Sequence, residues 1–154
     1  MIFKMAIFVG EHSATVDDKG RIVLPAAFKK AMGEMALEFV ILEKNRIGKC
    51  LDIHTEETWS ENVRKFKKKL NPLNPKHDKL LQVYFQNFIR IGVSANGRIN
   101  IPKGFIEFAN LKKAVKFIGM YTSIRLIDAS DVSKPDITDD EYLEMLNMLN
   151  SEDD

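Results

Sequence analysis

A ten-residue stretch that occurs twice constrains the fold of this chain more than any other feature. Residues 16–25 read VDDKGRIVLP and residues 93–102 read VSANGRINIP, so Val, Gly, Arg, Ile and Pro recur at a constant offset of 77 residues. Phe28 and Phe105 extend the match at the same offset. The 154-residue chain therefore consists largely of two copies of one unit, and a unit of this size cannot bury a core alone.

Each copy carries the signals of a hairpin followed by a helix and a second hairpin. In the first copy, polar residues 17–20 separate two strand-like runs, and Gly20 supplies the positive φ that a tight turn needs. Pro25 suits the first position of a helix, and Gly33 can end it. The pattern predicts strands at 6–16, 22–24, 38–43 and 50–54 with a helix at 26–32, and then strands at 88–93, 98–101, 113–120 and 123–128 with a helix at 102–109.

Two further helices are predicted between the copies, and one after them. Thr55 can cap a helix over 56–69, and a second helix follows at 76–87. The apolar stripe on the first of these helices favours a core or a subunit contact; it consists of Trp59, Val63, Phe66 and Leu70. Thr138 begins a capping box for a tail helix, which we expect to pack on its own chain or on a neighbour. The predicted domains are a first unit at 6–54, connecting helices at 55–87, a second unit at 88–132 and an acidic tail with a short helix at 133–154.

These elements define an α+β fold that is mainly β. Two β-β-α-β-β units in tandem can interleave around a pseudo-two-fold axis, and we expect them to close a small barrel with one shared core. Closing the barrel would cover sheet edges that otherwise promote aggregation.

The composition favours a soluble globular protein and excludes several classes. With 45% hydrophobic and 29% charged residues, and no apolar run near the ~18 residues of a membrane span, we expect neither disorder nor a membrane partner. Cys50 is the only cysteine, which favours the reducing cytoplasm and an inert core position. Because His12, His54 and His77 lack ligand spacing, we predict no metal and no cofactor.

No group of residues in the sequence predicts an enzyme. Asp17 and Asp18 are adjacent and point apart, and no base, nucleophile or phosphate loop accompanies them. The charge distribution is more informative than the net charge of +1: residues 1–76 hold 14 basic and 10 acidic residues, whereas residues 77–154 hold 9 and 12. This asymmetry favours either one positively charged working face or a solvated acidic tail. The basic run at 64–69 is typical of a solvated helix face, with DNA contact as the alternative.

Three motifs resemble those of the MraZ family, whose units belong to the AbrB-like swapped-hairpin group. They are residues 8–12 (FVGEH), residues 17–21 (DDKGR) with Pro25, and residues 97–102 (GRINIP), and the resemblance spans roughly residues 7–132. It implies a transcriptional regulator that assembles as a ring-shaped homo-oligomer, an octamer or a dodecamer, and binds short direct repeats in double-stranded DNA. The implied action is repression of the division and cell-wall gene cluster, including the chain's own promoter, by a cytoplasmic, nucleoid-associated protein.

The resemblance assigns DNA contact to Lys19 and Arg21 in the first turn. Cationic side chains beside a tight turn can reach phosphates, and an arginine can pair with a guanine edge. We expect Asp17 to orient this turn by accepting backbone N–H groups, and Gly20 and Gly97 to form the two turns. Several turns on one ring would raise affinity through effective concentration.

The second turn departs from the family pattern of Asp-x-x-Gly-Arg. Ser94 replaces the aspartate, and Asn96 replaces the usual basic or polar residue. Arg98 and Asn96 are therefore assigned either a secondary DNA contact or a structural role. An architectural salt bridge is the alternative role for Arg21. A scaffold oligomer of the same fold that does not bind DNA is the alternative for the whole chain.

Overall fold

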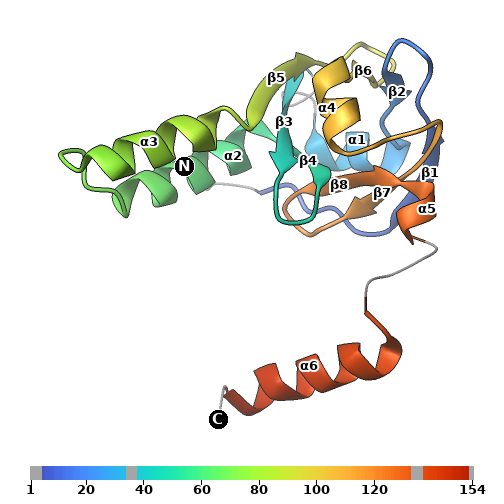
Figure 1. Cartoon of the computed structure of the whole chain (residues 1–154). Coiled ribbons are helices and arrows are strands. Elements are labelled where there is room, and N and C mark those ends of the chain that lie inside the picture. The colour runs from blue at the N-terminus through green and yellow to red at the C-terminus, as the bar shows by residue number, and fades with distance from the viewer. Residues whose placement is uncertain (1–4, 34–37, 133–136, 153–154) are drawn as a thin grey trace.

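The computed structural model describes residues 5–33, 38–132 and 137–152. The start of the predicted tail, residues 133–136, lies outside the described residues. The first unit contains β1 (Glu11–Thr15), β2 (Arg21–Val23), α1 (Ala26–Met32), β3 (Phe39–Asn45) and β4 (Cys50–His54). Next come α2 (Glu56–Lys68) and α3 (Pro75–Phe85), and then the second unit with β5 (Phe88–Gly92), β6 (Arg98–Asn100), α4 (Lys103–Phe108), β7 (Ala114–Gly119) and β8 (Ile124–Asp128). The chain continues with α5 (Ala129–Val132) and α6 (Asp139–Glu152) (Figure 1).

The predicted elements are present, and their ends shift by a few residues. The strand predicted at 6–16 is shorter, because Gly10 has a φ of 106° and only Phe8 pairs before it, in a single bridge to Tyr121. Helix α1 has the predicted bounds, and the N–H of Gly33 bonds to the carbonyl of Lys30 at its end. Thr55 caps α2 as predicted, since its hydroxyl accepts a hydrogen bond from the N–H of Thr58. The one element without a prediction is the short helix α5.

The strands of the two units exchange partners. The main sheet is antiparallel throughout, in the order β1-β7-β8-β4-β3-β5, and β2 pairs with β6 in a separate two-stranded ribbon. β1 of the first unit pairs with β7 of the second, and β5 pairs with β3 in the equivalent way. When each strand is replaced by its counterpart in the other unit, the same order results, read from the opposite end of the sheet, as a two-fold relation between the units requires.

The predicted barrel is wrong, because the six-stranded sheet is open. Among the described residues, β1 and β5 lie at its two ends and each pairs with one neighbour only. β2 and β6 are only three residues long, and they pair with each other and not with the main sheet. Pro25 and Pro102 follow these strands and direct the chain into α1 and α4, which ends the pairing there. Whether the units are swapped hairpins stays a prediction.

One hydrophobic core joins the two units. It lies among the sheet, the ribbon and the helices α1 and α4, and its members come from both repeats at matched positions. Ile22 and Ile99 are 2% and 1% exposed, and they are directly paired across the ribbon. Phe28 is fully buried and Phe105 nearly so. Neither repeat contains this core alone, which explains why the chain carries two copies.

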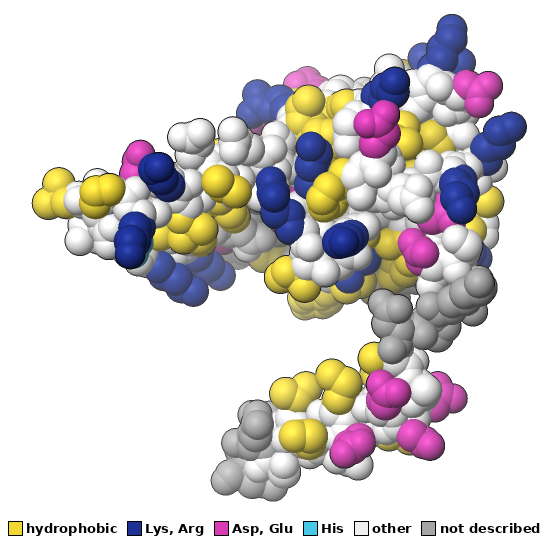
Figure 2. Space-filling model, viewed as in Figure 1, with side chains coloured by type: hydrophobic (Ala, Val, Ile, Leu, Met, Phe, Trp, Pro, Cys, Tyr) yellow, Lys and Arg dark blue, Asp and Glu magenta, His cyan; other side chains and the backbone are white. Residues whose placement is uncertain are grey.

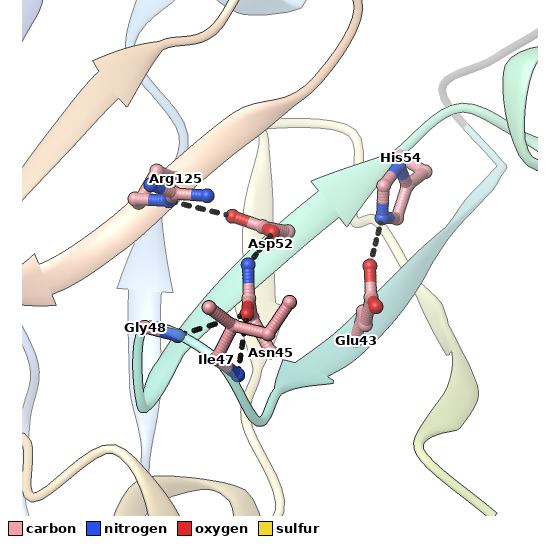
Figure 3. Close-up of polar contacts among 7 residues, drawn as sticks. All are labelled: Glu43, Asn45, Ile47, Gly48, Asp52, His54 and Arg125. Carbon is pink, nitrogen blue, oxygen red and sulfur yellow. Dashed lines mark hydrogen bonds and ion pairs between the residues drawn. The ribbon is translucent and has the colours of Figure 1, made fainter. Parts of the chain in front are cut away.

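A buried polar network crosses the sheet at the junction of the units (Figure 3). Asp52 on β4 is 6% exposed and accepts hydrogen bonds from Asn45 Nδ2 at 2.8 Å and from Arg125 Nε at 3.1 Å. Arg125 lies on β8, directly opposite Asp52 in the strand register. A buried carboxylate needs such partners, so this pair specifies how β4 of the first unit aligns with β8 of the second.

The helices α2 and α3 form a hairpin that projects from one side of the sheet body (Figure 1). The predicted stripe on α2 packs inside this hairpin and against β5: Phe66 stacks on Tyr84 with ring centroids 4.1 Å apart, and Trp59 contacts Phe88 at 5.6 Å. Trp59 and Phe66 of the stripe thus make intrachain contacts, and because the stripe is only half-buried, a subunit contact stays a prediction. Cys50 is buried in β4, as predicted, and burial raises the pKa of its thiol.

The tail helix α6 lies apart from the body (Figure 1). Its hydroxyl cap is present, because Thr138 Oγ1 accepts a hydrogen bond from the N–H of Glu141 at 3.2 Å. Its described side chains are all exposed, including the apolar ones Tyr142, Leu143, Met145, Leu146, Met148 and Leu149. Packing on its own chain is therefore not observed, and packing on a neighbour stays a prediction. No helix in the described part of the chain is long and apolar enough to cross a membrane.

Candidate nucleic-acid interface

The carboxylate of Asp17 organises the first turn. Its Oδ1 accepts the backbone N–H groups of Lys19 and Arg21, both at 2.9 Å, and its Oδ2 accepts Arg21 Nε at 2.6 Å. The backbone closes the same turn, since the N–H of Gly20 donates to the carbonyl of Asp17 at 3.0 Å and the N–H of Asp17 donates to the carbonyl of Arg21 at 3.0 Å. One aspartate thus fixes both the path of the turn and the direction of the arginine side chain.

These bonds also fix the charge of Asp17. The N–H of Arg21 is the largest influence holding the pKa of the Asp17 carboxyl below its usual value of 3.8. Desolvation opposes it, while the guanidinium of Arg21 and the N–H of Lys19 add to the lowering. The carboxylate is therefore ionised at neutral pH, and it holds Arg21 by charge as well as by geometry.

The two cations assigned to DNA contact lie at the surface of this turn. The side chains of Arg21 and Asp17 are 40% and 42% exposed, and Lys19 is exposed. Within the described residues, the ammonium group of Lys19 forms no ion pair or hydrogen bond. The ion pair of Arg21 uses Nε, which leaves its two terminal nitrogens for an external acceptor. The salt bridge considered as an alternative role for Arg21 thus exists, and it is compatible with a ligand contact.

The second turn repeats the backbone frame without the carboxylate. The N–H of Gly97 donates to the carbonyl of Ser94, and the Ser94 hydroxyl oxygen accepts the N–H of Arg98 at 3.0 Å. The Ser94 hydroxyl also contacts Asn96 Oδ1. Arg98 is exposed, and no described side chain holds its guanidinium. Instead Lys29 of α1 donates to the carbonyl of Ala95 at 2.7 Å, so a cation of the first unit braces this turn.

The two turns lie at opposite ends of the β2–β6 ribbon. Because the ribbon is antiparallel, Arg21 pairs with Asn100 at one end and Val23 pairs with Arg98 at the other. Each turn glycine also accepts a hydrogen bond from the opposite unit: the N–H of Ile101 bonds to the carbonyl of Gly20, and the N–H of Leu24 bonds to the carbonyl of Gly97. The ribbon and these hydrogen bonds therefore fix the position of each turn relative to the other.

A groove of about 600 Å³ opens beside the first turn. Residues 16–20 line one side of it, and residues of α4 and of the segment before β7 line the other. Three lysines of the second unit line this groove, namely Lys103, Lys112 and Lys113. The sequence did not predict them as site residues, because they are more than 80 positions away from the turn along the chain. The pairing of β1 with β7 brings Lys112 and Lys113 near the turn, and the pairing of β2 with β6 does the same for Lys103.

The basic run on α2 has the character of a solvated helix face. Arg64 pairs with Glu61 one turn earlier at 2.5 Å, and the run lies on the projecting hairpin and away from the ribbon turns (Figure 1). In the described residues, no three His, Cys, Asp or Glu side chains are placed to hold a metal ion.

Two strand-exchanging repeats with turns that carry exposed Lys and Arg side chains at the ends of a shared ribbon define a class of small two-repeat α+β proteins. Within that class, this chain belongs to the MraZ family. The family model described as MraZ protein matches residues 7–82. The family is one of transcriptional regulators, not enzymes.

Similar proteins from three bacteria, each named transcriptional regulator MraZ, match most of the chain. The relative from Phocaeicola vulgatus is 32% identical, over 88% of this chain and 88% of its own length. The relative from Bacteroides thetaiotaomicron is 28% identical, over 90% of this chain and 88% of its own length. The relative from Caldicellulosiruptor saccharolyticus is 35% identical, over 78% of this chain and 80% of its own length.

Proposed function

We propose that this chain is a transcriptional regulator that binds double-stranded DNA in a sequence-specific way through its first turn. The observation that carries the proposal is the Asp17-Lys19-Arg21 arrangement: a carboxylate holds an arginine at the surface, beside a lysine that forms no ion pair with a described residue. A positioned arginine can make two hydrogen bonds to a guanine, and the lysine can contact a phosphate. The names of the relatives support this assignment.

The second turn has a lesser role in this proposal. Arg98 is exposed but is not held by a carboxylate, so it supplies a phosphate contact or none. Asn96 is engaged with Ser94 and belongs to the structure of the turn. We assign the base contacts to the first turn for this reason.

We further propose that several copies act together. A single turn with two cations binds weakly, whereas a ring-shaped homo-oligomer multiplies affinity when the DNA repeats match the spacing of its turns. The exposed apolar side chains of α6 support a contact with a neighbouring subunit, because six large apolar groups on one helix favour burial. An octamer or dodecamer, short direct repeats as operator, and repression of the division and cell-wall gene cluster with its own promoter complete the proposal, with action in the cytoplasm at the nucleoid.

The test is binding of the purified chain to the DNA upstream of its own gene. We expect protection of short direct repeats in a footprint, and weaker binding to a duplex in which the repeats are scrambled. Because phosphate contacts release counterions, affinity should fall steeply as salt rises. Failure to bind the upstream DNA at low salt would instead favour a scaffold oligomer of the same fold.

A further inference from the structure

The groove beside the first turn has lysines at its rim and an apolar floor. Its floor consists of Val16, Ile101, Ile106 and Leu111, and its lysines are Lys19, Lys103, Lys112 and Lys113. Three acids also line it, namely Asp17, Asp18 and Glu107. Figure 2 shows Lys and Arg side chains, with Asp and Glu between them, at the end of the molecule that holds β1, β2 and α4 in Figure 1.

The backbone fixes the lysine pair against the turn. The N–H of Val16 donates to the carbonyl of Lys113 at 2.9 Å, directly before the turn begins. The N–H of Lys112 donates to Asp128 Oδ1 at 2.8 Å, and the other oxygen of Asp128 accepts the hydroxyl of Ser130. Asp128 is 5% exposed, so a buried anchor holds the segment. The side chains of Lys112 and Lys113 extend from a backbone that has little freedom to move.

The lysines differ in whether their ammonium groups form ion pairs with other side chains. Lys103 lies 3.8 Å from Glu107, with both side chains mostly exposed, which is a weak ion pair. In the described part of the chain, the ammonium groups of Lys112 and Lys113 form no ion pair. Of the acids, Asp17 is engaged with Arg21 and Glu107 lies near Lys103, whereas the carboxylate of Asp18 forms no hydrogen bond or ion pair with a described residue.

The sequence of the first unit has no lysine pair at the positions equivalent to Lys112 and Lys113. The segment before β3, residues 33–38, is the counterpart of the segment that holds Lys112 and Lys113, and it contains no Lys or Arg. Lys29 occupies the position equivalent to Ile106, and its ammonium group is bound to the carbonyl of Ala95. The two turns therefore share a backbone frame but differ in the described cations that the opposite unit places beside them. Lys112 and Lys113 beside the first turn form no ion pair with a described residue, whereas Lys29 beside the second turn is bound to a carbonyl.

We propose that Lys112 and Lys113, assisted by Lys103, bind the phosphates that flank the base contacts of the first turn, so that one DNA site is built from both units. This inference rests on the proposed function. Phosphate contacts set the position and orientation of a protein on the duplex, and base contacts supply the specificity. The lysine pair thus positions Arg21, and Asp18 opposes binding by repelling the backbone.

The test compares the double variant Lys112→Ala/Lys113→Ala with the wild type on a duplex that holds one operator repeat. Each lost phosphate contact lowers the slope of log K against log salt by about 0.9, so we expect the slope to fall by about 1.8. The ratio of affinities for the repeat and for a scrambled duplex should stay the same, since no base contact is lost. Lys65→Ala/Lys68→Ala on α2 is the matched control, because it removes the same charge from the projecting hairpin and should leave the slope unchanged.

The outcomes separate this inference from the proposed function. If the wild type binds the repeat specifically and the double variant keeps the wild-type salt slope, Lys112 and Lys113 do not contact phosphates, and the assignment of base contacts to the first turn stands. If the wild type shows no specific binding, the proposed function fails first. Asp18→Asn gives a second readout that does not depend on the folding of the double variant: it should raise affinity at low salt, and an unchanged or lower affinity contradicts the inference.

Discussion

The two turn glycines offer a matched pair of substitutions whose costs should differ. Gly20 and Gly97 have φ angles of 81° and 84°, so an alanine at either position pays a similar backbone penalty of about 1–2 kcal/mol. Their surroundings are not alike. A Cβ at Gly20 would lie 2.4 Å from the carbonyl oxygen of Ile101, whereas a Cβ at Gly97 would meet first the flexible side chain of Lys29, at 3.2 Å.

The closer contact adds a second cost at Gly20. Ile101 cannot move away without straining the 2.8 Å hydrogen bond from its N–H to the carbonyl of Gly20, and losing such a bond costs about 1 kcal/mol. We therefore expect Gly20→Ala to lower the free energy of unfolding by about 2–3 kcal/mol. Gly97→Ala should cost only about 1–2 kcal/mol, because the stem of Lys29 can turn aside.

Urea denaturation of the two variants and the wild type measures this difference directly. The midpoints should shift without a change of the slope m, and Gly20→Ala should have the lower midpoint. In thermal melts, each kcal/mol corresponds to about 2–4 °C for a chain of this size. Equal losses, or a larger loss for Gly97→Ala, would refute the account of the contact between Gly20 and Ile101.

Three further predictions follow from the polar contacts. The Asp17 carboxyl should titrate below its usual pKa of 3.8 in carbon-detected NMR, and a midpoint at or above 3.8 would contradict this. Because the pKa is lowered in the folded state, the contribution of this carboxylate to stability is present above pH 3.8 and is lost as pH falls through the folded-state pKa. Asp17→Ala should weaken binding to a repeat duplex at least tenfold with the oligomer intact in light scattering, because Arg21 is no longer held; full binding would show that the carboxylate is dispensable. Asp52→Ala should lower the free energy of unfolding by about 2–4 kcal/mol in urea, because Arg125 and Asn45 lose their buried partner, and a loss under about 1 kcal/mol would mean that water replaces the carboxylate.

Local sequence signals were sufficient for the elements of each unit. Pro25 and Gly33 bracket α1 with the predicted bounds, since both residues act on the backbone at their own positions. The polar turn at 17–20 also lies where expected, because Gly20 has the positive φ that its position requires. The repeat then predicted correctly that the units share one core.

Closure of the sheet could not be predicted in the same way, because it depends on pairing between distant strands. The repeat predicts that strands exchange partners between units, but not that β2 and β6 leave the main sheet to form a ribbon. That outcome depends on the length of these strands and on the exit of the chain at Pro25 and Pro102. A pattern of apolar residues gives neither the partner nor the end of a strand.

The candidate site likewise has a part that the local sequence predicts and a part that depends on contacts between the units. Asp17, Lys19 and Arg21 are neighbours in the sequence, so their arrangement follows from one turn. The bond from Lys29 to Ala95 and the placement of Lys112 beside the first turn join residues of different units. Such contacts arise from the pairing of strands across the repeats, and a single sequence carries no local signal for them.

DNA binding by the first turn is tested most directly with the double variant Lys19→Ala/Arg21→Ala, whose binding to the upstream DNA of the gene is measured beside the wild type across a salt series. We expect specific, salt-sensitive binding by the wild type and loss of that binding in the double variant, with an unchanged oligomer in light scattering. Wild-type affinity and wild-type salt dependence in the double variant would contradict the claim that the first turn binds DNA.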